Sequence, residues 1–425
     1  MFAGHHLKTA ALAILLTCCG AISAEDDVVE FLNGTKLTGT ITSIRKTDRE
    51  FDFETKVGAR TLQRVYPFSK VHAVVYNGER YELTPKSAGK LSPDDQRTER
   101  EVLALIESSG KTPPDWFEST KLNYPKTLDL AWPLKAPPGG WNTRKNVGQF
   151  IWSVVNENPP RWRSGVKLVH HLVSLHQGEP ALLSRDMNQL GKMYFELLQD
   201  YERAAYWYQR GEPTMGTPNG VHLAECYWRL GNREMALDLM RGKSLNVAAI
   251  KLLGDMGEIE WSLRLTKAFA KSRASYQANI LAGDALRQAG RLDEAIAAYQ
   301  KVVDADTYRN AEYKARFVGR ARESIETIRL FDQADVTKVA DGIHRGYSTG
   351  YNGQLDVEAR VQGGRLQSVE ITKHKEKQFY SALTDTPAQL VEQQGVENID
   401  ATSGATITSQ AIVNATARAL AEGSK

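Results

Sequence analysis

The sequence predicts a multidomain protein in which a small all-β unit, a helical unit and an α+β unit follow one another. Short apolar strands separated by Asn-Gly turns occupy residues 25–85. A helical periodicity with recurring small and aromatic residues occupies residues 147–332, and alternating strands followed by helical stretches occupy residues 339–425. The length of 425 residues allows roughly two to four domains, which agrees with this division.

Composition excludes several classes of protein. Hydrophobic residues make up 41% and charged residues 25% of the chain, which is an ordinary balance for a globular protein. The formal net charge of +3 is small, and nucleic-acid binding needs a concentrated basic patch, so we expect no nucleic-acid partner. There is no CxxC pair and no His/Cys cluster, so we expect no metal site.

The first 24 residues have the pattern of an export signal. Residues 5–8 include basic side chains, and the apolar run 10–17 is too short to span a bilayer. Small residues then precede an acidic run, which predicts cleavage after Ala24 and a periplasmic or extracellular protein. The alternative is a membrane-associated lipoprotein acylated on Cys18 or Cys19. Cleavage leaves only Cys226, which lies in a helical pattern and is expected to be a core residue.

Residues 25–85 read as a small β-barrel module. The strand Val28–Leu32 meets Asn33-Gly34, a strong hairpin signal, and a second Asn-Gly pair follows at residues 77–78. Five short strands in fewer than sixty residues suit an SH3-like or Sm-like barrel. We expect an accessory or protein-contact module, and the sequence does not identify its ligand.

Residues 86–146 predict one helix followed by a connector rich in Pro and Trp. Ser92 can cap the helix, Pro93 fits its first turn, and Gly110 can end it. A free linker has nowhere to bury large aromatic side chains, so we expect the connector to pack against a neighbouring domain. A polysaccharide-binding aromatic platform is the alternative.

The helical unit, residues 147–332, carries weak internal repeats. Leu223, Ala224, Tyr227, Gly231, Ala236 and Met240 form one pattern, and Ala282, Gly283, Leu286, Gly290, Ala295 and Tyr299 repeat it. This spacing resembles the tetratricopeptide superfamily over roughly residues 182–305. The resemblance implies a solenoid whose concave surface docks a partner protein, and a mere spacer between the end domains stays open as the alternative.

The C-terminal unit begins near Val339. Side chains alternate cleanly from Leu355 to Val361, a second strand follows a Gly-Gly turn, and Thr386-Pro387 is expected to open a short helix. Residues 400–409 then read as a loop before a last helix, for which Thr408 or Ser409 is the expected cap.

The loop 400–409 suits a bound phosphate. A helix N-terminus presents unpaired N–H groups and the positive end of the helix dipole, so it favours an anion. Gly404 allows close approach of the backbone, and the hydroxyls of Ser403 and Thr408 can donate to phosphate oxygens. Thr406 is a candidate acceptor for a phosphoester. Ordinary helix capping by these side chains is the alternative.

The loop and the strands before it resemble the FMN-binding domain family, of the type found in the Rnf-complex G subunit and the sodium-pumping NADH:quinone oxidoreductase C subunit. Its S-G-A-T signature covers residues 403–406, and the resemblance spans about residues 339–421. The resemblance implies FMN as cofactor, moved from FAD onto Thr406 by a flavin transferase. The implied cofactor-binding residues around this anchor are Asp400, Ser403, Gly404, Ala405, Thr408 and Ser409. His344 departs from the aromatic residue often found at its position.

Two further residues are candidates for the flavin site. His374 and Glu376 could contact the flavin ring or transfer protons, since histidine titrates near neutrality. Their place among several lysines also fits a solvated strand end, which is the alternative.

Together these features predict an exported flavoprotein that carries FMN, covalently on Thr406, and transfers electrons to or from a redox partner protein. A membrane electron-transport complex is one candidate for that partner. No G-x-G-x-x-G motif follows a strand, so direct oxidation of NAD(P)H by a stand-alone enzyme is not expected. The alternatives are a repeat-based scaffold that binds FMN non-covalently or not at all, and a reductase of a small external substrate.

Overall fold

The computed structural model describes a defined set of residues, namely 27–31, 36–45, 50–57, 60–68, 71–83, 96–135, 141–331, 333–376, 382–397, 399 and 405–424. The predicted signal peptide, residues 1–24, lies outside the described residues, and so does the lipoprotein alternative at Cys18 or Cys19. Among the described residues, no helix is both long enough and apolar enough to cross a membrane.

The N-terminal unit is a six-stranded antiparallel sheet. Its order is β4-β3-β2-β1-β5-β6. The strands are β1 (Asp27–Phe31), β2 (Lys36–Arg45), β3 (Glu50–Val57), β4 (Arg60–Pro67), β5 (Val71–Tyr76) and β6 (Glu79–Glu82). A bulge in β2 between Ile41 and Ser43 shifts its register with β3, and such a bulge bends a strand.

This sheet has one more strand than the five predicted from the sequence. Alternate side chains of β1, β2, β3 and β5 form a small core that includes Val29, Phe51, Phe53 and Val71. The additional strand, β4, pairs with β3 over its whole length. Among the described residues, β4 and β6 are the two edge strands of the sheet and are not paired with each other. The closed SH3-like or Sm-like barrel therefore stays a prediction.

Helix α1 (Glu99–Lys111) follows; it begins later than predicted, and the expected cap Ser92 lies outside the described residues. The N-cap is Thr98, whose side chain accepts from the N–H of Glu101 while the Glu101 carboxylate accepts from the N–H of Thr98. This capping box satisfies two otherwise unpaired N–H groups, which fixes the start of the helix at that point.

The connector packs against the helical unit, as expected from its aromatic residues. The guanidinium of Arg185 lies 3.6 Å from the centre of the Trp132 ring, and Lys167 donates to the carbonyl of Phe117 at 2.8 Å. These contacts account for Trp132 and Phe117 as packing residues, so the polysaccharide-binding alternative has no support from them.

The central unit is helical throughout. It starts with α2 (Val147–Phe150), the π-helical turn η3 (Ile151–Val155) and the 3-10 turn η4 (Pro159–Arg161). Its longer helices are α3 (Trp162–Leu175), α4 (Pro180–Met193), α5 (Tyr201–Gly211), α6 (Pro218–Arg229), α7 (Arg233–Met240), α8 (Ala249–Asp255), α9 (Ile259–Ala268), α10 (Ser275–Gln288), α11 (Leu292–Val303) and α12 (Ala311–Arg329). A second π-helical turn, η5 (Tyr194–Leu198), lies between α4 and α5. Cys226 is buried in this unit, as predicted.

Small residues allow two of the helix pairs to approach closely. A Cβ at Gly191 would lie 2.6 Å from the ring of Tyr208, and one at Gly283 would lie 2.5 Å from the ring of Tyr299. Both tyrosines are fully buried. Glycine and tyrosine therefore interlock between α4 and α5 and again between α10 and α11, while the tetratricopeptide-like solenoid stays a prediction.

The C-terminal unit is α+β, with a three-stranded antiparallel sheet in the order β7-β8-β9. Its elements are η6 (Val336–Lys338), β7 (Gly342–Thr349), β8 (Gln354–Gln362), β9 (Arg365–Lys373), α13 (Ala382–Gln393) and α14 (Thr406–Glu422). Helix α13 begins before the predicted Thr386-Pro387 start, and Pro387 lies inside it. A Cβ at Gly346 would lie 2.0 Å from the carbonyl oxygen of Ala415, so β7 packs directly on α14.

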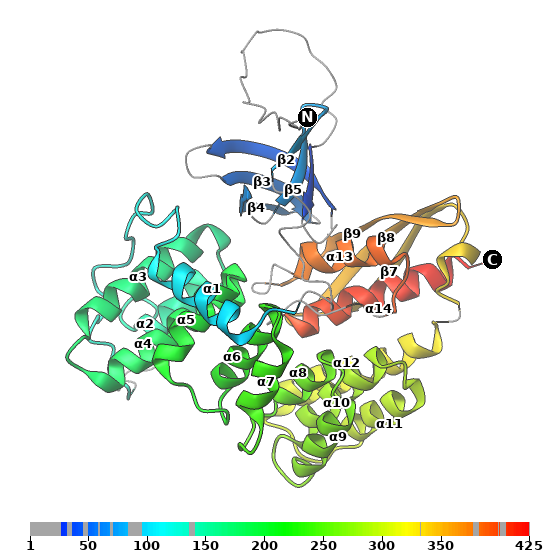
Figure 1. Cartoon of the computed structure of the whole chain (residues 1–425). Coiled ribbons are helices and arrows are strands. Elements are labelled where there is room, and N and C mark those ends of the chain that lie inside the picture. The colour runs from blue at the N-terminus through cyan, green and yellow to red at the C-terminus, as the bar shows by residue number, and fades with distance from the viewer. Residues whose placement is uncertain are drawn as a thin grey trace, which may run out of the picture.

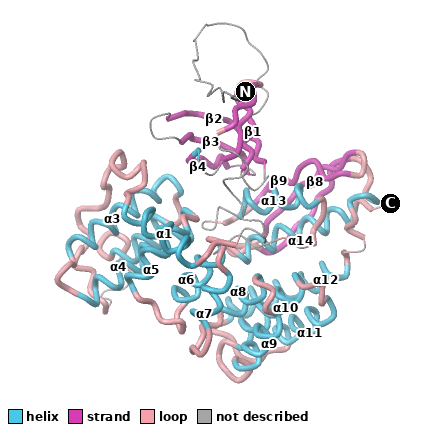
Figure 2. The backbone as a smooth tube through the Cα atoms, viewed as in Figure 1, coloured by secondary structure: helices cyan, strands magenta, loops and turns pink. Residues whose placement is uncertain are grey.

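The N-terminal sheet and the C-terminal unit lie on the same side of the helical unit (Figure 1). The helices form an arc, and the C-terminal unit lies within it with α14 facing α8, α10 and α12; Figure 2 shows how the strands stay on one side of this arc. Arg64 of β4 donates to Thr384 of α13 at 2.9 Å, and Arg163 of α3 bonds both oxygens of Glu50 in β3. The β-sheet unit thus contacts both other units.

Candidate flavin site

The start of α14 is the centre of the candidate site, and it lies earlier than predicted. The first helical residue is Thr406 and the N-cap is Ala405, which has no side chain able to accept a hydrogen bond. The N–H of Ser409 already donates to the carbonyl of Ala405 at 3.0 Å, so Thr408 and Ser409 belong to the first turn and do not cap it. The N–H groups of this first turn have no intrahelical partner, which is the arrangement that favours a phosphate.

The predicted loop residues divide between described and undescribed parts of the chain. Asp400, Ser403 and Gly404 lie outside the described residues. Ala405 is buried and Thr406 is half-buried. Thr408 and Ser409 are almost completely buried, so only Thr406 combines a hydroxyl with partial exposure among the described residues 405–409.

A cavity of about 260 Å³ adjoins the first turn of α14. One wall consists of residues 405–408 and Tyr351, and the opposite wall comes from the helical unit. The residues that the helical unit contributes are Val221, His222, Glu225, Ala248, Lys251, Leu252 and Leu281. Sequence reasoning missed all seven, because nothing in a local pattern shows that α6, α8 and α10 face a loop at the far end of the chain.

The polar side chains of the helical wall are held in place by neighbours. His222 stacks on Phe195 with ring centres 4.3 Å apart, and its Nδ1 lies 3.2 Å from the Tyr208 hydroxyl. Burial lowers the pKa of His222, which favours the neutral ring. On the same wall, Glu225 accepts from Arg229 at 2.9 Å, and Lys251 pairs with Asp255 one turn along α8.

The turn at residues 350–353 contributes Tyr351 to the other wall of the cavity. The Glu376 side chain packs against this turn and accepts a hydrogen bond from it. The Glu376 side chain is 0% exposed, and its carboxylate accepts from the backbone N–H of Asn352 at 3.4 Å. A Cβ at Gly350 would lie 2.2 Å from Glu376 Oε1, so this position has no room for a larger residue. Burial raises the pKa of Glu376, while its hydrogen bonds with Asn352 and Tyr351 oppose that shift.

The alternative of a solvated strand end is therefore wrong for Glu376. His374 is half-buried, with both ring nitrogens shielded from solvent. Neither residue is among the described residues that line the cavity. Glu376 instead interacts with two parts of the cavity wall, the turn that carries Tyr351 and the Thr408 side chain in the first turn of α14.

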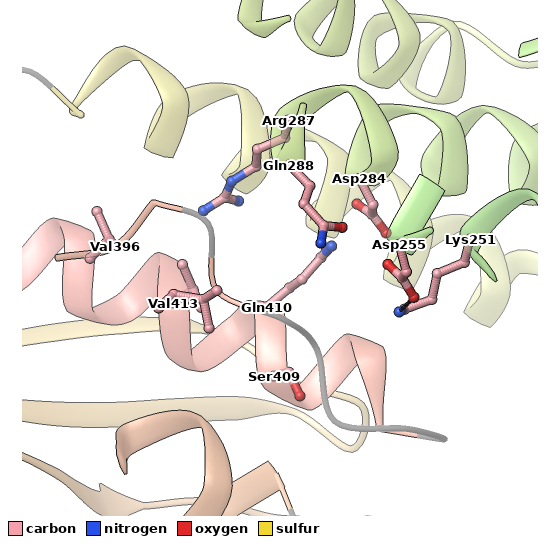
Figure 3. Close-up of a pocket in the computed structure, with 10 residues that line it drawn as sticks. Lys251, Asp255, Asp284, Arg287, Gln288, Val396, Ser409, Gln410 and Val413 are labelled. Carbon is pink, nitrogen blue, oxygen red and sulfur yellow. Dashed lines mark hydrogen bonds and ion pairs between the residues drawn. The ribbon is translucent and has the colours of Figure 1, made fainter. Parts of the chain in front are cut away.

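A hydrogen-bonded contact fastens α14 to the helical unit next to the cavity. Arg320 of α12 donates to Gln410 Oε1 through Nε at 2.9 Å and through Nη2 at 2.6 Å, and it pairs with the buried carboxylate of Asp284. Arg287 donates to Asn414 at 3.0 Å. Figure 3 shows Asp284, Arg287 and Gln410 around a smaller cavity of about 50 Å³, which Lys251 also lines.

Comparison with known proteins agrees with the geometry of the C-terminal unit. The family model of the FMN-binding domain matches residues 350–421, which include β8, β9, α13 and nearly all of α14. The C-terminal unit is therefore an FMN-binding domain, FMN is its cofactor, and the chain is a flavoprotein. The match contains Thr406 and the whole of the 405–408 wall.

Two other comparisons add little about function. The chain is 27% identical over 112 residues to an uncharacterized protein of Treponema pallidum (strain Nichols). That match covers 26% of this chain and 31% of the relative, so the chain spans about a third of the length of the relative it matches. No solved structure matches the chain.

Among the described residues there is no group of three His, Cys, Asp or Glu side chains that could hold a metal ion.

Proposed function

We propose that this protein is an exported electron-transfer flavoprotein whose FMN is esterified to Thr406. The observation that supports this most is the position of Thr406. It is the first residue of α14, inside the FMN-binding domain, half-buried, and on the wall of a cavity. Bound FMN supplies reversible uptake of one or two electrons, while the protein sets its position and exposure.

Attachment would be a phosphoryl transfer catalysed by a flavin transferase. The Thr406 Oγ1 attacks the phosphorus of the FMN half of FAD, and the bond to the AMP half breaks. The products are a phosphoester on Thr406 and AMP, and the hydroxyl proton is released. The threonine then contributes the oxygen that holds the phosphate at the N-terminal end of α14, where unpaired N–H groups stabilise its negative charge.

The remaining predicted residues have supporting roles in this proposal. Asp400, Ser403, Gly404 and Ala405 form the sequence that the transferase recognises. The buried Thr408 and Ser409 shape the first turn of α14. Glu376 positions the turn that carries Tyr351, and His374 lies two residues before Glu376, directly after β9.

Export and partner docking complete the proposal. The pattern in residues 1–24 favours export, and a covalent tether would prevent loss of FMN outside the cytoplasm. The helix pairs with interlocked glycine and tyrosine support a tetratricopeptide-like solenoid, and such solenoids bind partner proteins. We propose that this helical unit docks the redox partner.

The proposal is tested by co-expression with a flavin transferase and detection of flavin fluorescence in a denaturing gel. Thr406→Val should abolish the fluorescent band because the nucleophilic oxygen is gone. Thr416→Val is the matched control: its hydroxyl donates to the Ile412 carbonyl within α14, so labelling should persist. Labelling of Thr406→Val at the wild-type level would show that the anchor is elsewhere.

A further inference from the structure

The cavity next to Thr406 has two walls that come from different units of the protein. One wall belongs to the FMN-binding domain and the other to α6, α8 and α10 of the helical unit. A ring tethered to Thr406 through a ribityl phosphate must lie in space close to that residue. Helices α6, α8 and α10 of the helical unit line the space beside Thr406, so they are in position to contact the ring.

The chemistry of the lining matches an isoalloxazine ring. That ring has two apolar faces and one polar edge, which carries carbonyl oxygens and an N–H group. Aliphatic side chains line the cavity from both walls, including Val221, Leu252, Leu281 and Ile407. Ligand pockets are typically about 300–1,000 Å³ and mostly apolar with a few placed polar groups, so a cavity of about 260 Å³ is close to the size for the ring portion.

The polar groups of the helical wall are complementary to the polar edge of the ring. Lys251 can donate to a carbonyl oxygen, and Glu225 can accept from an N–H. Each is held by an ion pair with a residue four positions further along its own helix, Asp255 and Arg229 respectively. The neutral His222 is fixed by Phe195 and Tyr208 beside them.

We propose that the helical unit forms the second half of the flavin site, enclosing the ring between α14 and helices α6, α8 and α10, with Lys251 facing the polar edge of the ring. This inference rests on the proposed attachment of FMN to Thr406. It assigns the inner surface of the helical arc to the cofactor. A redox partner would then meet the protein at the outer surface or at the mouth of the cavity.

Lys251 is a positioning and tuning residue in this arrangement. A cation next to the flavin stabilises the more electron-rich reduced form, because the attraction grows as electron density is added. Removing the charge also takes the Lys251 ammonium away from the Asp255 carboxylate, which acts in the same direction. The reduced form should therefore become less stable relative to the oxidised form when Lys251 is replaced.

The first test uses the full-length flavinylated protein and iodide quenching of flavin fluorescence at constant ionic strength. Because ligand pockets bury roughly 70–90% of a ligand's surface, quenching in the native protein should be about three- to tenfold weaker than in the urea-unfolded chain. Equal quenching in both states would overturn the inference. Absence of flavin from the denatured chain would instead overturn the attachment to Thr406.

The second test measures the two-electron midpoint potential of the attached flavin in Lys251→Met. We expect the oxidised form to be favoured about tenfold more, which corresponds to a potential about 30 mV more negative. Lys251→Arg keeps the charge and should restore the wild-type potential. Lys267→Met removes the same charge from an exposed position on α9 and should have no effect. A wild-type potential in Lys251→Met, or an equal shift in Lys267→Met, would overturn the role of Lys251.

Discussion

The buried contact between Arg320, Asp284 and Gln410 joins α10 and α12 of the helical unit to α14, and its loss should destabilise the folded protein. The side chains of Arg320 and Asp284 are only 5% and 7% exposed, and Tyr299 also donates to Asp284 at 2.7 Å. Arg320→Met would leave the Asp284 carboxylate buried with its charge unpaired. Breaking a buried ion pair from one side costs about 3–5 kcal/mol.

Replacing Gln410, the second partner of Arg320, should lower the free energy of unfolding by a smaller amount. Gln410→Leu removes the oxygen that accepts two hydrogen bonds from the guanidinium, but it leaves the ion pair with Asp284 intact. A hydrogen bond to a charged group contributes about 1.5–3 kcal/mol, so this variant should lose about that amount. The order of the two effects is thus fixed: Arg320→Met should be the more destabilised protein.

Urea unfolding followed by circular dichroism and by tryptophan fluorescence measures both variants. Arg322→Met serves as the control, because Arg322 is an exposed residue on the same helix and its loss should change stability by less than about 0.5 kcal/mol. A loss below about 1 kcal/mol in Arg320→Met would refute the reasoning that the carboxylate depends on Arg320. Equal losses in Arg320→Met and Gln410→Leu would refute the ranking.

Three further perturbations have expected outcomes. Gly346→Ala should lose about 1–3 kcal/mol in urea unfolding, because its Cβ would lie 2.0 Å from the Ala415 carbonyl, whereas Gly319→Ala, with nothing within 4 Å, should be neutral or stabilising. Thr98→Ala should cost about 1 kcal/mol by thermal unfolding, since it removes the capping box of α1. Burial lowers the pKa of His170 to about 4, so unfolding takes up a proton once the pH falls below its unfolded value near 6.5. Stability should therefore fall by roughly 2–3 kcal/mol between pH 6.5 and 4 and level off below that, and a His170→Gln protein should lack this part of the slope.

Local sequence patterns predicted much of the fold because they act over short distances. The alternation from Leu355 to Val361 in β8 gives the buried–exposed pattern that the structure shows. Cys226 is buried as expected. Strand β4 was missed, since its sequence Arg60–Pro67 has weak alternation and is held by pairing with β3. Likewise, Thr408 or Ser409 was the expected cap of α14, whereas its N-cap is Ala405, which makes no side-chain capping bond.

The candidate site was predictable only in part, and for a related reason. The S-G-A-T signature and the strands before it indicated the cofactor, and they predict Thr406 as the attachment residue, because the signature consists of consecutive residues. The facing wall, with His222, Glu225 and Lys251, comes from helices that are brought to α14 by tertiary packing. No periodicity or spacing in the sequence records that contact.

The most direct test of the account is peptide mass spectrometry on the full-length chain produced with and without a flavin transferase. The account predicts that the peptide containing Thr406 gains the mass of one FMN less one water, only with the transferase, and that fragmentation places the addition on Thr406. An unmodified Thr406 under these conditions, or FMN attached to a different residue, would contradict it.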